Sequence, residues 1–135
     1  MMKKTIVLIL LLLSYFSYAE EKDCNHAINT IEINACLGKE LEVAEAQLAR
    51  YLAKSHERYD NQLAITDALD QSQQDWLVYR QSHCDAIYTV WSDVSIRGVM
   101  FGECMLKLTK QRTHQIWEDY LTYMDNTPPL LPEPK

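Results

Sequence analysis

The amino-acid sequence predicts an all-α fold, a small antiparallel bundle of three helices stapled by two disulfides. Between Glu20 and Thr127 the chain contains no proline, and its three glycines stand at positions 38, 98 and 102. The same stretch is rich in Ala, Leu, Glu and Gln, a composition typical of helices. Its large apolar side chains recur in alternating steps of three and four, the spacing of a helix with one buried face. Four cysteines in this stretch supply the two disulfides.

The first helix is expected to begin near Asn29 and to end at about Tyr59. The Asn29 side chain can cap the helix while Glu32 reaches back, which is a capping-box arrangement. Residues 60–62, Asp-Asn-Gln, are typical of a turn. The stripe of this helix that should face the core consists of Leu37, Leu41, Ala44, Leu48, Tyr51 and Ser55.

The second helix is expected to run from this turn to about Trp91 and to lie at the centre of the bundle. Its stripe consists of Ile65, Leu69, Ser72, Trp76, Tyr79, His83, Ala86 and Val90. Aromatic side chains bury large areas, so the core should be built around this stripe. The predicted core residues are Trp76, Tyr79 and His83 from this helix, Leu48 from the first and Leu108 from the third.

A polar loop is expected to follow, and then a third helix. One side of that helix carries Phe101, Met105, Leu108, Arg112, Ile116, Tyr120 and Tyr123. All four prolines of the chain fall within residues 127–135, and proline cannot continue a helix. This segment is therefore expected to be an extended or disordered tail after a helical domain of residues 20–126.

The first 19 residues have the three parts of a signal peptide. A basic head, Met1 to Lys4, precedes an apolar run and then Ser17-Tyr18-Ala19, which places small residues before a cut at Glu20. The apolar run is shorter than the ~20 residues that a membrane-spanning helix needs. No cysteine follows the cut directly, so a lipid anchor is not expected. The sequence predicts cleavage and export to the periplasm or beyond, without membrane insertion.

The exported part is strongly acidic. Its 116 residues keep all 19 acidic side chains and 11 of the 13 basic ones, for a net charge of −8. This charge argues against nucleic acid or an anionic membrane as a partner, and favours a cationic partner. An acidic exported protein is also simply soluble, and charge alone does not separate the two explanations.

The four cysteines are expected to form two disulfides, because an even number of cysteines in an oxidising compartment is typical of a disulfide framework. The alternative is a four-thiolate zinc site, but the usual C-x-x-C pairs are missing. If the helices fold back on one another, Cys36, Cys84 and Cys104 meet at one end of the bundle, and Cys24 can reach it. The glycines lie at this end too, where a missing Cβ allows backbones to approach.

This clustering allows any of the three pairings. We favour Cys24–Cys36, which folds the N-terminal segment onto the first helix, and Cys84–Cys104, which staples the second helix to the third. Each closes a short loop worth about 3 kcal/mol in the chain-entropy model.

Several segments carry a resemblance to a known family. They are Cys24…Thr30-x-Glu32-x-x-x-Cys36, Ala44-Glu45-x-x-Leu48 with Tyr51, Gln73-x-x-Trp76-x-x-Tyr79-Arg80-x-x-x-Cys84, and Cys104-x-x-x-Leu108-Thr109-x-x-Arg112. Over nearly the whole exported chain this pattern resembles the LprI-type lysozyme inhibitor domain. The resemblance implies a small helical domain exported to the bacterial envelope, in a family with a member that binds and inhibits lysozyme.

The chain departs from the family pattern at three places. Glu45 and Ala49 stand where the family commonly has Asp and Asn, and residues 95–98, Ser-Ile-Arg-Gly, replace a Gly-Gly-Ser-like loop. The loop change matters most, because an exposed loop can carry partner specificity.

No combination of residues predicts catalysis, a metal or a cofactor. His83-Cys84 could suggest a nucleophile, but an oxidised cysteine has no thiolate to attack with. The other histidines have no partner at metal-binding spacing, and Glu40, Glu42 and Glu45 are expected to be solvated carboxylates on a helix. No nucleophile elbow, phosphate loop or zinc helix motif occurs. The chain is predicted to be a non-enzyme.

Two arginines fall on faces that should be partly buried. Arg80 flanks the Trp76 face, and either Glu42 or Glu45 is near the right level to pair with it. Arg112 falls on the apolar side of the third helix. Because a buried unpaired charge is costly, we expect structural ion pairs that fix helix register. The alternative is that Arg80 binds a partner.

The expected recognition surface is the loop between the second and third helices. The candidates are Tyr88, Trp91, Asp93, Arg97 and Phe101. The alternative is that Trp91 and Phe101 merely close the end of the core, which is the expectation for Phe101. Aromatic side chains beside an acidic residue at a rigid end suit an anchor that enters a sugar-binding cleft. The hypothesis is that this end docks with a cationic lysozyme-like glycoside hydrolase. The alternatives are an immunity or accessory protein for another secreted partner, and a structural envelope module without inhibitory activity.

Overall fold

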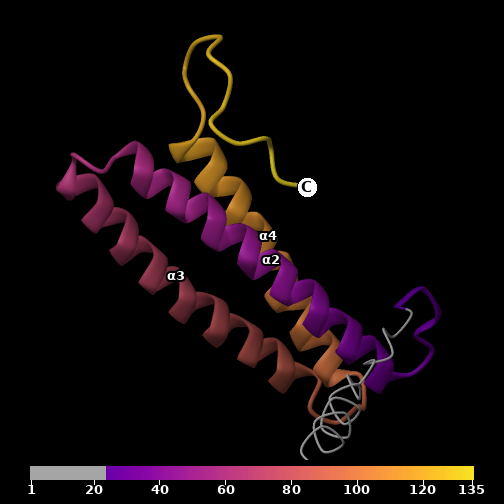
Figure 1. Cartoon of the computed structure of the whole chain (residues 1–135). Helices are drawn as coiled ribbons and strands as arrows, with labels where there is room; N and C mark the ends of the chain where they lie inside the picture. Colours follow the sequence, from indigo (N-terminus) through magenta and orange to yellow (C-terminus); the bar gives the residue numbers. More distant parts are fainter. Residues whose placement is uncertain (1–23) are drawn as a thin grey trace, which may run out of the picture.

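The computed structural model describes residues 24–135, which contain three α-helices and no strand (Figure 1). In chain order the elements are a short 3-10 helix, η1 (Cys24–His26), then α2 (Thr30–Arg58), α3 (Leu63–Val90) and α4 (Arg97–Tyr120). The predicted all-α, three-helix fold is confirmed. The signal peptide expected over residues 1–19 lies outside the described residues. None of the helices described here is both long enough and apolar enough to cross a membrane.

The central position of the bundle belongs to α4. This helix packs against both α2 and α3, whereas α3 is set apart from α2 along most of its length (Figure 1). The prediction that the second helix lies at the centre is therefore wrong. Its buried residues are only Leu69 and Cys84. By contrast, α4 buries Val99, Met105, Leu106, Thr109, Thr113 and Ile116.

Small side chains explain why α4 can pack closely against both α2 and α3. Thr109 and Thr113 are almost wholly buried, and the threonine hydroxyls donate to carbonyls of the same helix, Thr109 Oγ1 to Met105 O at 2.7 Å and Thr113 Oγ1 to Thr109 O at 3.0 Å. Because the helix itself satisfies these hydroxyls, their burial carries no unpaired polar group. Small side chains at a contact also shorten the distance between helix axes.

The start of α2 follows the predicted capping arrangement. Asn29 is the N-cap, and its side-chain oxygen accepts from the Glu32 backbone N–H at 3.0 Å. The Glu32 carboxylate reaches back to the backbone N–H of Ile28 at 3.1 Å, one residue before the cap. Two N–H groups at the start of the helix are thereby satisfied, which locks the helix start.

The face that α3 presents to the bundle is offset from the predicted stripe. Leu69 and Trp76 pack with the main core cluster, Arg80 bonds to α4, and Cys84 is disulfide-bonded to α4. From Trp76 these positions follow steps of four, to Arg80 and Cys84, whereas the predicted stripe takes a step of three to Tyr79 and so continues one residue away. Tyr79 is 51% exposed, and it stacks on His83, also exposed, with ring centroids 5.5 Å apart. The prediction that these two side chains belong to the core is wrong.

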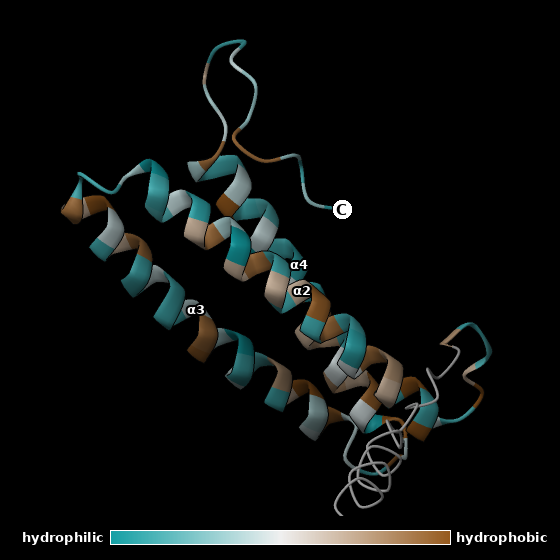
Figure 2. Ribbon diagram, viewed as in Figure 1, coloured by the Kyte–Doolittle hydropathy of each residue, from teal (hydrophilic) through white to brown (hydrophobic). Residues whose placement is uncertain are grey.

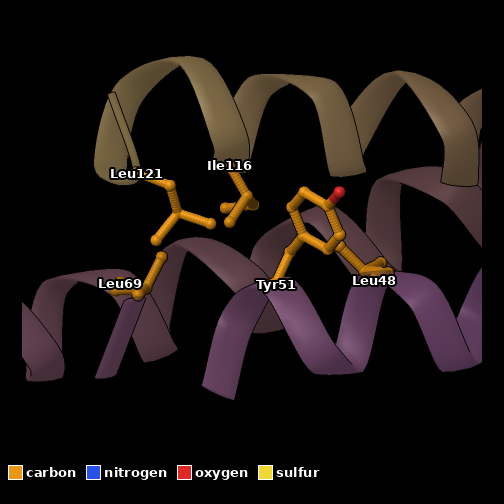
Figure 3. Packing of buried hydrophobic residues seen from close by; sticks show 5 residues of the cluster. All are labelled: Leu48, Tyr51, Leu69, Ile116 and Leu121. Carbon is orange, nitrogen blue, oxygen red and sulfur yellow. The ribbon is translucent and has the colours of Figure 1, made fainter. Parts of the chain in front are cut away.

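The core consists of two clusters along the helices. The cluster nearer the α2–α3 turn contains Leu48, Tyr51, Leu69, Ile116 and Leu121, which point toward one another from all three helices (Figure 3). The cluster nearer the cysteine end contains Leu37, Ala44, Val99 and Leu106. Trp76 packs against the first cluster and is partly buried, as is Leu108. Hydrophobic and hydrophilic residues are interleaved along every helix (Figure 2), in keeping with helices that bury one face each.

The segment after α4 is extended but ordered. It loops away from the bundle and returns to it (Figure 1), where Leu130 and Leu131 pack on the first core cluster. The indole N–H of Trp117 donates to Leu131 O at 2.9 Å, and the Tyr51 hydroxyl donates to Pro132 O at 2.5 Å. Of the two expected forms, extended or disordered, the segment has the extended one, and its two leucines add to the core while its carbonyls accept from Trp117 and Tyr51.

Both predicted disulfides are confirmed. Cys24 is bonded to Cys36, and Cys84 to Cys104, with Cα–Cα distances of 5.6 and 5.7 Å. Cys84 is completely buried between α3 and α4, whereas Cys24 is exposed in η1, which buries no residue. The two bonds therefore differ in what they hold: one joins two helices of the bundle, and the other pins a short surface segment.

Two glycines at the cysteine end permit a close approach of α4 to α2. A Cβ on Gly102 would lie 3.2 Å from Leu37 Cδ1 and 3.4 Å from Leu37 Cβ, and one on Gly98 would meet the Asn34 side chain at 2.9 Å. A Cβ on Gly38 would meet nothing within 4 Å. The expectation that all three glycines serve close packing thus holds for Gly98 and Gly102 and is wrong for Gly38.

A matched pair of substitutions tests this difference. Gly38→Ala is expected to raise the free energy of unfolding by about 0.5–1 kcal/mol, because alanine favours the helix and the space is open. Gly102→Ala gains the same helix propensity but crowds the buried Leu37. Its free energy of unfolding should therefore be about 1–2 kcal/mol lower than that of Gly38→Ala. Urea unfolding of the two variants measures the difference, and equal stabilisation would contradict a close contact at Gly102.

Candidate functional site

Trp76 lies at the junction of the three helices, beside two arginines. The guanidinium carbon of Arg80 is 5.0 Å from the centroid of the Trp76 ring system, and that of Arg112 is 5.9 Å away. Both distances are within the range of a cation–π interaction. Arg80 comes from α3 and Arg112 from α4, so the indole is a shared contact for two cations from neighbouring helices.

Arg80 joins α3 to both other helices. Its Nη1 donates to Glu45 Oε1 of α2 and to Thr109 Oγ1 of α4, each at 2.8 Å. The Arg80 side chain is only 11% exposed, whereas that of Glu45 is 45% exposed. The Arg80 Nε is buried and has no hydrogen-bond partner among the described residues. Of the two predicted partners, the structure pairs Glu45 with Arg80, and Glu42 makes no ion pair in the described part of the chain.

Arg112 is held by neutral groups. Its Nε donates to Gln73 Oε1 at 3.1 Å, and its Nη2 donates to Ser72 Oγ at 2.8 Å. Burial lowers the pKa of the Arg112 guanidinium below its ordinary value, and the nearby Tyr120 and Asp119 oppose this shift. The prediction of a carboxylate partner for Arg112 is wrong. Side-chain amide and hydroxyl oxygens take that place, and the indole adds a third contact.

These contacts bring together the most specific part of the sequence pattern. The residues concerned are Glu45, Gln73, Trp76, Arg80, Thr109 and Arg112. They sit between helices and bond to one another, so their main effect is to fix the register of α3 on α4 and α2. This sequence pattern therefore consists of residues that hold the helices together. Residues that recognise a partner have to be sought among the exposed side chains.

The loop between α3 and α4 exposes a group of apolar side chains. α3 ends at Val90, Trp91 is the C-cap, and tight turns follow, closed by Val94 N–H to Trp91 O at 3.2 Å and Arg97 N–H to Val94 O at 3.3 Å. Trp91 is 38% exposed, Val94 47% and Ile96 39%. Asp93 is also exposed. This group, Trp91, Asp93, Val94 and Ile96, is called the loop patch below.

The sequence reasoning treated this loop as polar and missed Val94 and Ile96. The available signal was the pair of β-branched apolar residues at alternate positions in a loop, where no helix stripe can account for them. Exposed contiguous apolar surface is uncommon on soluble proteins and often marks an interaction site.

Tyr88 and Arg97, also predicted to bind a partner, support the loop from within the chain. The Arg97 guanidinium carbon lies 5.1 Å from the Tyr88 ring centroid, and Arg97 Nη1 donates to Ser92 O at 3.2 Å. Tyr88 in turn packs edge-to-face against Phe101, with centroids 6.1 Å apart. The Cys84–Cys104 disulfide joins the two helices that flank the loop. These contacts and the disulfide hold the loop patch in place, and together they are called its braced support.

His83 and Cys84, considered above as a possible catalytic pair, lie on α3, where Cys84 forms a disulfide and His83 stacks on Tyr79. Among residues 24–135, no group of three or more His, Cys, Asp or Glu side chains could hold a metal ion. A shallow groove of about 330 Å³ between α3 and α4 is lined by His83, Ile87, Met100, Glu103, Cys104, Lys107, Leu108 and Gln111.

Comparisons with known proteins give a family. The family model described as lysozyme inhibitor LprI matches residues 21–116. The chain is also similar to an uncharacterized protein of Rhizobium meliloti (strain 1021), with 25% identity over 109 residues that cover 73% of this chain and 78% of that protein. No solved structure matches the chain.

Proposed function

Because the chain belongs to the lysozyme inhibitor LprI family, we propose that it inhibits a lysozyme-type cell-wall hydrolase by non-covalent binding. LprI domains are protein inhibitors and not enzymes, so the chain acts by binding. The family and the two disulfides are consistent with an exported protein. The signal peptide and a periplasmic or secreted location belong to the proposal, as does the identity of the hydrolase.

The observation that carries the proposal is the loop patch on its braced support. Trp91 is a large, partly exposed aromatic side chain flanked by Val94 and Ile96. Aromatic anchors of this kind dominate the binding energy of many interfaces, above all when they are held in place before binding. We expect Trp91 to enter the substrate-binding cleft of the hydrolase and to block access of the substrate.

Charge supports a cationic partner. The acidic residues of α3 are Asp67, Asp70, Asp75 and Asp85, and its single arginine, Arg80, is buried and already paired with Glu45. Asp93 extends this acidic surface to the loop patch. Opposite charges across an interface raise the association rate by steering the encounter, and salt weakens the effect.

The direct test adds the purified, oxidised protein to a lysozyme acting on cell walls, with an amidase that cleaves the wall peptide as a second hydrolase. Slowing of the lysozyme alone supports the proposal. Failure to slow the lysozyme, together with recovery of a different protein in a pull-down, would favour an accessory or immunity role.

Trp91→Ala is expected to raise the inhibition constant by about thirtyfold, the effect of a moderate hot spot. The matched control is Val43→Ala, which removes an apolar side chain that is 72% exposed on α2, away from the loop. Both variants should keep the melting temperature of the parent. If the two substitutions had the same small effect on inhibition, the binding site would lie elsewhere.

Asp93→Lys is expected to slow association with the hydrolase and to flatten its dependence on salt. The reversal of one exposed charge changes steering more than the lifetime of the complex, so the association rate should fall several-fold while the dissociation rate changes less. Stopped-flow or surface-based kinetics at low and high salt measures both rates. An unchanged salt dependence would exclude Asp93 from the interface.

A further inference from the structure

The C-terminal segment occupies a seam between α2 and α4 through directional contacts. The Leu130 N–H donates to Leu121 O at 2.9 Å, the Trp117 indole to Leu131 O, and the Tyr51 hydroxyl to Pro132 O. Glu133 Oε1 lies 3.1 Å from His114 Nε2. The contacts come from both helices, Tyr51 from α2 and His114 and Trp117 from α4.

This set of contacts has the chemistry of a site for an extended proline-rich peptide. Proline has no N–H, so such a peptide offers carbonyls that only a host donor can satisfy. Grooves that bind proline-rich peptides use aromatic side chains, which pack on the ligand and donate to those carbonyls. Trp117 and Tyr51 fulfil both functions here, and Leu130 and Leu131 insert into the apolar cluster.

The segment is joined to the bundle by an exposed connection. Residues 123–129 are all exposed and loop away from the helices (Figure 1). The residues that match the family model end at 116, before Trp117 and the whole segment. We propose that the seam formed by Tyr51, His114 and Trp117 is a binding site for an extended proline-rich peptide, and that residues 130–133 occupy it as a tethered ligand.

The surroundings of the seam define the ligand further. His114 faces Glu133, so an acidic residue directly after the position of Pro132 is favoured. An open groove of about 320 Å³ is lined by Lys135 together with Lys39, Lys110 and Glu40. An acidic residue at position 135 of a ligand would meet two lysines. The ligand class is therefore a peptide with two leucines followed by a proline and an acidic residue. The seam lies at the opposite end of the bundle from the loop patch, so this site is independent of hydrolase binding.

The test uses the full chain with Leu130→Ser and Leu131→Ser, which should release its own segment from the seam. A synthetic peptide of residues 127–135 is expected to bind this variant and to raise its melting temperature. The unaltered protein should bind the peptide at least about tenfold more weakly, because its tethered segment competes at millimolar effective concentration. A peptide with both leucines replaced by serine is the negative control. A folded, cooperatively melting variant that fails to bind the peptide would overturn the proposal.

Two further substitutions resolve the contacts. Trp117→Phe in the released variant keeps a ring but loses the donor to Leu131 O, and should weaken peptide binding about tenfold. A peptide with Lys135→Glu should bind several-fold more tightly than the natural one, owing to Lys39 and Lys110. If neither change altered the affinity, the peptide would not be bound in the seam.

Hydrogen exchange on the unaltered protein tests the proposal even if the variant does not fold. A tethered ligand leaves its site by a local opening, so the Leu130 N–H should exchange at least about tenfold faster than the buried amide of Ile116. Exchange of both amides at one common rate, that of global unfolding, would show the segment to be an inseparable part of the fold and would overturn the proposal.

Discussion

Removal of the disulfide between α3 and α4, by Cys84→Ala with Cys104→Ala, is expected to lower the free energy of unfolding by about 3 kcal/mol. The bond closes a loop of 20 residues. α3 buries few residues of its own, so its position depends heavily on this cross-link and on the Trp76 junction. Urea unfolding followed by circular dichroism measures the loss, which is a large share of the stability of a domain this small.

The matched control is Cys24→Ala with Cys36→Ala. Its loop of 12 residues gives a nearly equal value in the chain-entropy model. The structure leads to a different expectation, because this bond pins only η1, which buries no residue. Without this bond the segment can move without disturbing the bundle. The loss in free energy of unfolding should therefore be no more than about half of the chain-entropy value. Equal losses for the two pairs would show that η1 stabilises the core.

Glu45→Ala is expected to cost about 2–3 kcal/mol, a large effect for a half-exposed carboxylate. The reason lies in its partner, because Arg80 is 11% exposed and would keep only the Thr109 hydroxyl and the Trp76 ring as contacts. Truncation of one member of a partly buried ion pair leaves the other charge uncompensated. Thermal and urea unfolding measure the loss.

Glu42→Ala is the control, since the sequence alone could not choose between the two glutamates. Glu42 is exposed on the same helix and makes no ion pair within residues 24–135, so its loss should change stability by less than about 0.5 kcal/mol. Arg80→Met tests the same contact from the other side. It should lower the melting temperature, whereas normal melting with lost inhibition would identify Arg80 as a binding residue.

Local signals in the sequence were enough to predict the helices. The cap at Asn29, the turn after Tyr59 and the absence of proline act within a few residues, and the bounds of α2 and α3 agree with the prediction. The gathering of the cysteines at one end also followed from helix lengths, because antiparallel helices of known length place their ends side by side. The contacts between the helices were harder to predict from the sequence.

The face of α3 that packs against the bundle depends on a single step in the apolar pattern. From Trp76, a step of three leads to Tyr79 and then to His83, whereas a step of four leads to Arg80 and then to Cys84, so the two stripes lie one residue apart. The choice is made by contacts with α4, where Thr109 accepts Arg80 and Cys104 bonds Cys84. The residue pattern within one helix does not indicate which side chains of a neighbouring helix it will contact.

The loop patch was predicted in part. Trp91 and Asp93 were named from their residue type and position, as were Tyr88 and Arg97, which also contact each other. A charged side chain beside an aromatic one suits both partner binding and internal support, so their contact leaves the prediction that they bind a partner in place.

By itself, the sequence determined an acidic, all-α chain with two disulfides and a family membership, because helix propensity, capping and cysteine spacing are short-range properties. The tertiary structure decided which helix is central, which glutamate pairs with Arg80, and that the proline-rich end returns to the core. Each of these depends on residues far apart in the chain, Tyr51 and Pro132 among them, whose contact exists only once α2 and α4 have packed.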